Sequence, residues 1–186
     1  MPAEPEVPTV KCVVFDLDDT LWPGTLLEGT AGPVPESHVK ALHELARRGI
    51  ALSICSKNEI TAARSRLERD GLWHMFVFPK VNYLPKSENI RQSIAELQLR
   101  PPNVAFIDDS DFNLAEVAAS IEGIQTYGAD NWTSLLNLPQ FSTSSKTAEA
   151  TDRALMYKTH EQRVRAKKSS ASYDQFLSSC GIHCDL

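Results

Sequence analysis

The sequence predicts an α/β fold in which about five parallel strands form a central sheet with helices on both faces. Short apolar runs alternate along the chain with amphipathic segments, and this alternation is typical of strands joined by crossover helices. The run Val10–Phe15 is apolar, rich in β-branched residues and ends abruptly in acids, which indicates a strand buried on both faces. Further strands are expected over 50–55, 76–78, 104–107 and 124–127.

Between these strands, apolar residues recur at the spacing of a helix that buries one face. The expected inner faces are Val39, Leu42, Leu45 and Ala46; then Ile60, Ala63 and Leu67; then Ile90, Ile94 and Leu97; then Leu114, Val117, Ala118 and Ile121. Residues suited to helix ends flank them. We expect Asn58 and Ser87 to cap the second and third helices, and Gly49 and Gly71 to close the first and second.

The domain plan has three parts. Residues 1–9 are acidic and proline-rich and are expected to be disordered, residues 10–139 form the core, and residues 140–186 form a linker and a helical extension. In the extension we expect a Ser/Thr-rich linker over 141–147, a long polar helix over 149–167 and a shorter helix over 173–179. The stretch Trp22–Pro35 is too short for a cap domain, so the site is expected to be open to a macromolecular or a small substrate.

Composition excludes several classes of protein. The 186 residues suit one domain, and a net charge of -5 argues against a nucleic-acid partner. The cluster Arg163, Arg165, Lys167 and Lys168 is read as a solvated helix face. No apolar run approaches the roughly 18 residues that a membrane span needs, and the start lacks the features of a signal peptide. Four cysteines without paired spacing indicate a reducing compartment, so the expected location is the cytoplasm.

Acidic residues gather directly after two of the predicted strands. They are Asp16, Asp18 and Asp19 after the first strand and Asp108, Asp109 and Asp111 after the fourth. Adjacent parallel strands would bring these carboxylates close together, where like charges repel unless a cation neutralises them. Oxygen ligands of this kind favour Mg²⁺. Either cluster alone would be read as a solvated loop, but the two together predict a magnesium site.

The segment Asp16-Leu17-Asp18-Asp19-Thr20 resembles the first motif of the haloacid dehalogenase superfamily. Ser56 at the end of the second strand, Lys86 before a helix and Asp108-Asp109 at the end of a later strand resemble the other three motifs, in family order. The resemblance implies a Rossmann-like core and Mg²⁺-dependent phosphoryl chemistry.

By this resemblance Asp16 is the nucleophile and a metal ligand. Asp18 gives a backbone carbonyl to the metal and acts as general acid and base, and Asp109 is the other metal carboxylate, supported by Asp108. The implied phosphate-binding set is Thr20, Ser56, Lys57, Asn58 and Lys86. A carboxylate attacks phosphorus only where the phosphoryl charge is masked, which a cation and a lysine can do.

A narrower resemblance is to the FkbH-like branch of this superfamily. It is carried by Trp22, Ile54–Asn58, Pro85–Glu88, Phe106–Asp109 and, in the tail, Leu155–Tyr157 and Tyr173–Leu177. Members load a glyceryl unit from 1,3-bisphosphoglycerate onto the phosphopantetheine arm of an acyl carrier protein for polyketide biosynthesis. The chain is then expected to be a self-standing short member or a domain of a megasynthase.

Cys55 separates two readings of the chemistry. It is either a small core residue, as buried cysteines often are, or the thiol that accepts the acyl group before transfer to the carrier. Two functions are alternatives to glyceryl transfer. One is a magnesium-dependent phosphatase in which Asp16 is the only nucleophile, and the other is a catalytically silent docking domain.

Overall fold

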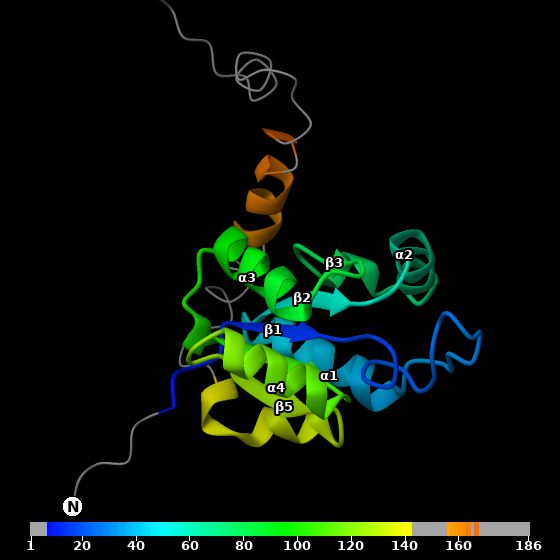
Figure 1. Ribbon diagram of the computed structural model, residues 1–186, viewed down its shortest axis with the longest axis horizontal. Coiled ribbons are helices and arrows are strands. Elements are labelled where there is room, and N and C mark those ends of the chain that lie inside the picture. The colour runs from blue at the N-terminus through cyan, green and yellow to red at the C-terminus, as the bar shows by residue number, and fades with distance from the viewer. Residues whose placement is uncertain (1–6, 143–155, 165, 168–186) are drawn as a thin grey trace, which may run out of the picture.

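The computed structural model describes residues 7–142, 156–164 and 166–167. Its centre is a five-stranded parallel sheet in the order β3-β2-β1-β4-β5 (Figure 1). The strands are β1 (Cys12–Phe15), β2 (Ala51–Ser56), β3 (Lys80–Val81), β4 (Val104–Asp108) and β5 (Gln125–Gly128). The predicted α/β architecture is confirmed.

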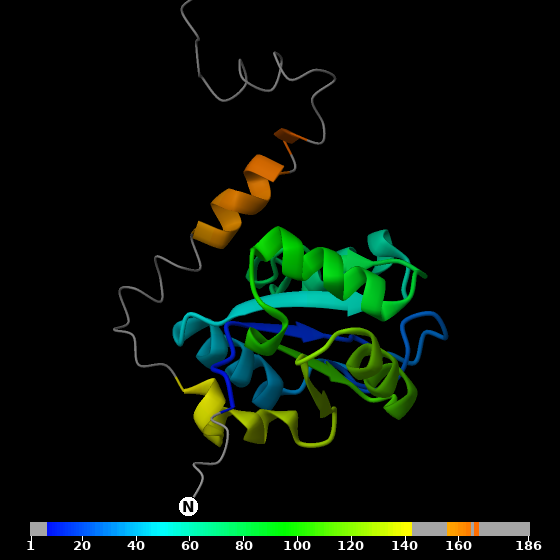
Figure 2. The same cartoon turned by 60° about the vertical axis from the view of Figure 1, so that its left-hand side comes forward.

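Helices cover both faces of the sheet because its strands are apolar on both sides. In β1, Val13 and Phe15 join one core cluster, whereas Cys12 and Val14 join the other. The first cluster is covered by α1 (Glu36–Arg47) and α2 (Ile60–Arg69), and the second by α3 (Lys86–Leu97) and α4 (Asp111–Ser120), as Figures 1 and 2 show. Short 3₁₀ helices complete the described core at η1 (Trp73–Met75), η2 (Pro101–Asn103), η3 (Trp132–Asn137) and η4 (Pro139–Phe141).

Two of the predicted helix caps are wrong. The side chain of Glu59 caps α2 by accepting from the backbone N–H groups of Thr61 and Ala62. Because Glu59 supplies the cap, the side chain of Asn58 is available to the site. The third helix begins two residues earlier than a cap at Ser87 implies, at Lys86, with Pro85 as its N-cap.

Two residues expected on inner helix faces are exposed. Ile60 and Ala118 face solvent, whereas Ala63 and Leu67 of α2 and Val117 of α4 are buried. Ile60 is the first residue of α2. It therefore lies at the rim of the sheet rather than over its face, which helical spacing alone does not reveal.

The third predicted strand is displaced along the chain. Phe76 makes only an isolated bridge with Leu52, and the paired strand is Lys80–Val81. Phe78 lies between them with a φ of 48°, a left-handed conformation that a bulky residue rarely adopts, and Pro79 follows it. Both features interrupt the ladder, so the apolar run 76–78 leads into the edge strand instead of forming it.

A helical segment over 156–164 and 166–167 packs beside the edge of the sheet (Figure 2). Tyr157 is buried in the second core cluster, and the Glu161 carboxylate accepts from the backbone N–H of Phe78 at 2.9 Å. This contact supplies a partner for the strained residue. Residues 143–147 of the predicted linker, residues 149–155 of the predicted long helix and the whole predicted helix over 173–179 lie outside the described residues, as do residues 1–6 of the predicted disordered segment.

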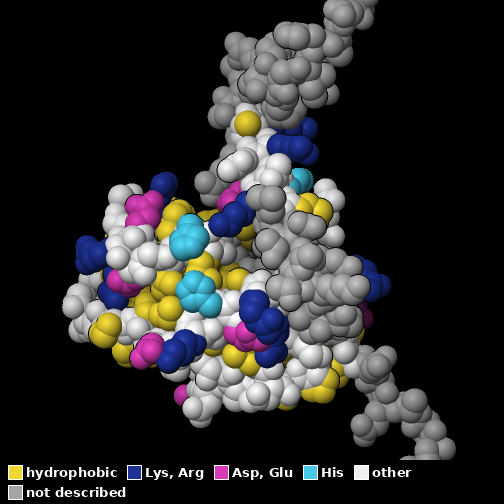
Figure 3. Space-filling model, turned by 180° about the vertical axis from the view of Figure 1, so that it is seen from behind, with side chains coloured by type: hydrophobic (Ala, Val, Ile, Leu, Met, Phe, Trp, Pro, Cys, Tyr) yellow, Lys and Arg dark blue, Asp and Glu magenta, His cyan; other side chains and the backbone are white. Residues whose placement is uncertain are grey.

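On the face shown in Figure 3, apolar side chains reach the surface beside histidine side chains. Partly buried residues such as Val39, Trp73 and Met75 pack against the outside of the first core cluster. Within the described ranges, no helix has both the length and the apolar character needed to cross a bilayer.

Candidate active site

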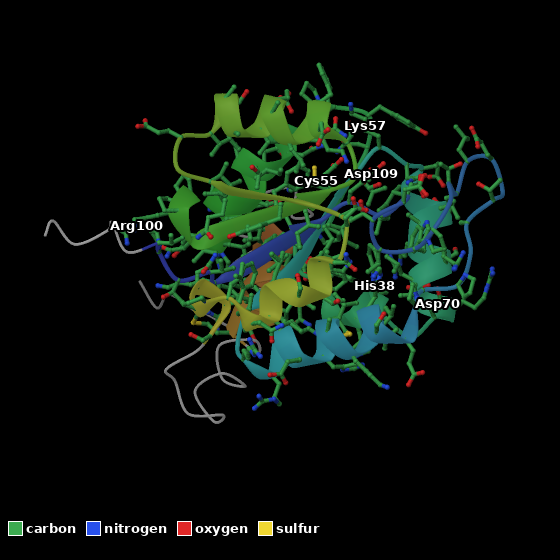
Figure 4. The ribbon with its side chains drawn as sticks, turned by 90° about the horizontal axis from the view of Figure 1, so that it is seen from below. His38, Cys55, Lys57, Asp70, Arg100 and Asp109 are labelled. Carbon is green, nitrogen blue, oxygen red and sulfur yellow. The ribbon has the colours of Figure 1, made fainter. Side chains whose placement is uncertain are left out.

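The carboxyl ends of β1 and β4 bring three acids together. Phe15 pairs with Ile107 in the sheet, and the backbone N–H of Asp16 donates to the Ile107 carbonyl at 2.9 Å. One carboxylate oxygen each from Asp16, Asp108 and Asp109 lies within 4.8 Å of the others. This is the edge where ligands gather in parallel sheets. Figure 4 shows Asp109, Cys55 and Lys57 at this end of the sheet and Arg100 at the opposite end.

Lys86 is the counter-charge of this acidic group. Its ammonium lies 2.5 Å from Asp108 Oδ2 and 3.0 Å from Asp16 Oδ1, and the two carboxylates raise its pKa against the opposing effect of burial. A reciprocal amide pair between Asn82 and Asn89, with distances of 3.1 and 2.8 Å, fastens the preceding loop to the first turn of α3. The two carboxylates thus hold the ammonium, and the amide pair holds the start of the helix that carries it.

Asp108 and Asp109 differ in how their carboxylates are used. Asp108 Oδ2 accepts from Lys86, and its Oδ1 accepts from the Ser110 N–H at 2.9 Å and from Asn113 Nδ2 at 3.0 Å. Asp109, next along the chain, is exposed. These contacts make Asp108 a structural carboxylate and leave Asp109 available beside Asp16. Oxygen donors in this arrangement fit a divalent cation such as Mg²⁺.

The charges of the cluster are costly without a cation. Burial raises the pKa of Asp16. Lys86 opposes this shift, and the charge of Asp108 adds to it. Burial and the same neighbour also raise the pKa of Asp109. Both carboxylates thus lie where their ionised forms are disfavoured, and a bound cation would relieve this cost.

The carboxylate of Asp18 is held by the loop that follows β1 and by Asn58. Its Oδ1 accepts from Trp22 Nε1 at 2.9 Å and from the Leu26 N–H at 3.0 Å, and its Oδ2 accepts from Asn58 Nδ2 at 2.9 Å. The same amide of Asn58 lies 3.2 Å from Ser56 Oγ. Asn58 therefore links Asp18, the expected general acid, to Ser56, an expected phosphate ligand.

The other expected phosphate ligands occupy different environments. Ser56 and Thr20 are buried, and Thr20 Oγ1 has no hydrogen-bond partner in the described part of the chain. Lys57 is exposed at the mouth of the site. A buried hydroxyl without a partner is costly, and this one lies within the first acidic motif.

Cys55 lies directly beneath the site. Its side chain is 0% exposed and belongs to the second core cluster, and its Sγ donates to the carbonyl oxygen of Lys86 at 3.7 Å. Burial, which outweighs the attraction of Lys86, raises the pKa of its thiol to about 12. In this conformation the thiol is neutral and shielded from a substrate at the mouth.

The partners of Asp108 are not predicted from the sequence. Ser110 caps α4, its hydroxyl accepting from the Asn113 N–H at 3.4 Å, while the side chain of Asn113 turns back to Asp108. A serine followed three residues later by a helical polar residue is the available signal. It identifies a helix start but does not reveal which carboxylate the amide contacts.

Exposed apolar side chains follow the carboxyl ends of several strands. Five of them lie in segments that follow strand ends and are between 42% and 84% exposed: Leu27, Ile60, Tyr83, Leu84 and Phe112.

Comparison with solved structures shows the fold. The N-terminal part of a Bacteroides fragilis protein, which contains a phosphatase domain and is complexed with Mg, matches with a TM-score of 0.65 and 23% identity over 74% of this chain; the match spans 42% of that protein. The cobalt-bound deoxy-D-mannose-octulosonate 8-phosphate phosphatase of Haemophilus influenzae matches with a TM-score of 0.54 and 17% identity, covering 91% of this chain and 97% of that one.

A haloacid dehalogenase-like hydrolase from Streptococcus pneumoniae matches with a TM-score of 0.50 and 18% identity, covering 77% of this chain and 97% of that one. No protein-family model and no curated protein sequence matches. The sheet with its flanking helices thus has the Rossmann-like core of haloacid dehalogenase-like hydrolases.

Proposed function

We propose that this chain is a magnesium-dependent phosphatase that uses Asp16 as an aspartyl nucleophile. The observation that carries the proposal is the meeting of Asp16, Asp108 and Asp109 around one position, with the buried ammonium of Lys86 beside them. The phosphatases among the structures that share this core support the same reaction class.

The proposed reaction has two steps. The Asp16 carboxylate forms a bond to phosphorus, the bond from phosphorus to the ester oxygen breaks, and Asp18 gives that oxygen a proton. Water then attacks phosphorus of the aspartyl phosphate, Asp18 takes a proton from it, and Asp16 is released with inorganic phosphate. Lys86 and Ser56 hold the phosphoryl oxygens throughout.

A cation held by Asp16, Asp109 and the backbone carbonyl of Asp18 would supply charge neutralisation for the phosphoryl group. Lys86 is placed to add to this effect, since its ammonium is buried and its charge is only weakly screened. Two further side chains position these groups: Asp108 orients Lys86, and Asn58 orients Asp18.

The test is phosphate release from a panel of phosphate esters with Mg²⁺ and with EDTA. Wild type should turn over only with the cation, and Asp16→Asn should lower kcat/KM by about 10³-fold or more because the nucleophile is lost. Asp111→Asn is the matched control, since this exposed acid follows β4, as Asp109 does, but begins α4. Retained turnover in Asp16→Asn would refute the mechanism.

A second candidate is transfer of a glyceryl unit from 1,3-bisphosphoglycerate to an acyl carrier protein. The position of Cys55 against Lys86 and the exposed apolar side chains that follow the strand ends favour it. The thiolate of Cys55 would attack the acyl carbonyl, the phosphate at that carbon would leave, and the carrier thiol would then take the acyl group. The centre at Asp16 would remove the second phosphate. Because Cys55 is buried, the segment that carries Lys86 must move first.

The two candidates differ in their dependence on Cys55. Cys55→Ala should leave ester hydrolysis within about threefold of wild type in a phosphatase, because the hydrogen bond of the thiol goes to the Lys86 carbonyl and not to a reacting group. In a transferase it should abolish loading of the carrier. Intact-protein mass spectrometry of the enzyme and the phosphopantetheine-bearing carrier measures this directly, and a carrier that gains no acyl mass with wild type would remove the second candidate.

A further inference from the structure

One side chain of α2 holds the loop 23–35 that follows the first acidic motif. Arg66 Nη2 donates to the Gly32 carbonyl at 2.5 Å, and Nη1 donates to the Ala31 carbonyl at 3.4 Å. Its Nε donates to Asp70 Oδ2 at 2.8 Å, which fixes the guanidinium on the helix. Figures 1 and 2 show this loop projecting beyond the carboxyl ends of the strands on the same side as α2, and Figure 4 shows Asp70 on that side.

The same guanidinium covers the ring of Trp22, with its central carbon 5.2 Å from the ring centroid. The indole N–H of Trp22 donates to Asp18 Oδ1, and this oxygen also accepts from the Leu26 N–H. Arg66 therefore contacts both supports of one carboxylate oxygen. One is the ring of Trp22, and the other is the loop to which Leu26 belongs.

The loop is closed on itself, so a contact at its end constrains its middle. The Gly32 N–H donates to the Pro23 carbonyl at 2.8 Å, which joins the two ends. Gly24 has a φ of 79°, and a Cβ atom there would lie 2.4 Å from the carbonyl oxygen of Thr30, so only glycine allows this approach. Displacement of Gly32 would thus reach Leu26 through a closely packed turn.

We infer that Arg66 is a positioning residue for the reaction. By holding the loop and the ring of Trp22, it keeps the carboxyl group of Asp18 oriented to pass a proton to the leaving oxygen. The inference rests on the proposed function for the role of Asp18, whereas the clamp itself stands on the contacts of Arg66. A planar guanidinium with several donors is suited to hold two carbonyls and an aromatic face at once.

Arg64 provides a matched control on the same helix. It forms the same kind of ion pair, with Glu68 at 2.8 Å, and its central carbon lies 5.5 Å from the centroid of the Trp73 ring. Its side chain is 54% exposed, compared with 13% for Arg66. The two arginines thus share helix, pairing and ring contact, but only the ring beneath Arg66 contacts Asp18.

The experiment compares Arg66→Gln and Arg64→Gln on two substrates. An alkyl phosphate has a poor leaving group that needs a proton, whereas p-nitrophenyl phosphate has a good one. Arg66→Gln should lower kcat/KM for the alkyl ester about tenfold more than for the aryl ester, a fraction of what a general acid contributes. Arg64→Gln should leave the ratio unchanged. Equal losses of kcat/KM on both esters would show that Arg66 only stabilises the fold, which would overturn the inference.

Hydrogen–deuterium exchange of the peptide around Leu26 tests the clamp without activity. Arg66→Gln should speed exchange in this loop, and Arg64→Gln should not. Unchanged exchange in Arg66→Gln would overturn the clamp. If wild type hydrolyses no phosphate ester, the proposed function fails and the role assigned to Asp18 falls with it, whereas the exchange result still decides whether Arg66 holds the loop.

Discussion

Lys86 Nζ lies 2.5 Å from Asp108 Oδ2 in a pair whose side chains are 2% and 0% exposed. Taking one member away from a buried ion pair leaves the other charge without compensation. The second carboxylate on the same ammonium, Asp16, adds to this effect. The pair therefore holds the site together as well as lining it, and stability and chemistry depend on the same lysine.

Lys86→Met should lower the free energy of unfolding by about 3–5 kcal/mol, because buried carboxylates lose their counter-charge. Urea unfolding at pH 7 in EDTA measures it. Adding Asp108→Asn should restore part of the loss, since the orphaned charge is then absent. Lys40→Met, at the exposed pair with Glu36, should cost less than about 1 kcal/mol. Equal losses in the two lysine variants would contradict the account.

Asp16→Asn should keep or raise stability while it abolishes turnover. Burial raises the pKa of Asp16 in the fold, so the folded protein binds its proton more tightly than the unfolded chain does. Stability is then lost as pH rises through the folded pKa, and a neutral amide avoids this loss. Thermal unfolding in EDTA should show a Tm for Asp16→Asn at or above that of wild type at pH 7, with the gap narrowing at lower pH.

Asp109 should control cation binding. Mg²⁺ should raise the Tm of wild type, because an ion that binds only the folded state stabilises it. Asp109→Asn should lose most of this shift, since its carboxylate is the exposed member of the acidic group. Asp19→Asn is the control: its carboxylate accepts from the Gly24 N–H at 2.7 Å. A shift retained in Asp109→Asn and lost in Asp19→Asn would reassign the ligand.

The sequence predicts the fold and the acidic edge because both depend on local pattern. Apolar runs that end in acids identify β1 and β4, and parallel pairing then places Asp16 near Asp109. The clamp by Arg66 joins positions more than thirty residues apart, and no spacing rule reports such a contact. The position of the edge strand is predicted wrongly for a similar reason. The turn at Phe78 depends on its backbone angle and on Glu161, which lies far along the chain.

Cys12 and Cys55, both buried in the described core, should make the protein less stable at alkaline pH. Burial raises the pKa values of Cys12 and Cys55 to about 12, from an ordinary value of 9.0. Above pH 9 the unfolded chain loses these protons while the folded chain keeps them, so stability falls as pH rises between the two values.

From pH 8 to pH 10 the loss should be about 1.4 kcal/mol for each thiol, since one pKa unit corresponds to about 1.36 kcal/mol. Urea unfolding at the two pH values measures it. Cys12→Ala should remove about half of the loss, and Cys12→Ala with Cys55→Ala should remove both parts. Other groups that titrate in this range are common to wild type and variants and cancel in the comparison. If the double variant loses as much stability as wild type, then Cys55 is not held as a neutral thiol beneath Lys86, and the thiol chemistry of the transferase becomes accessible without movement of that segment.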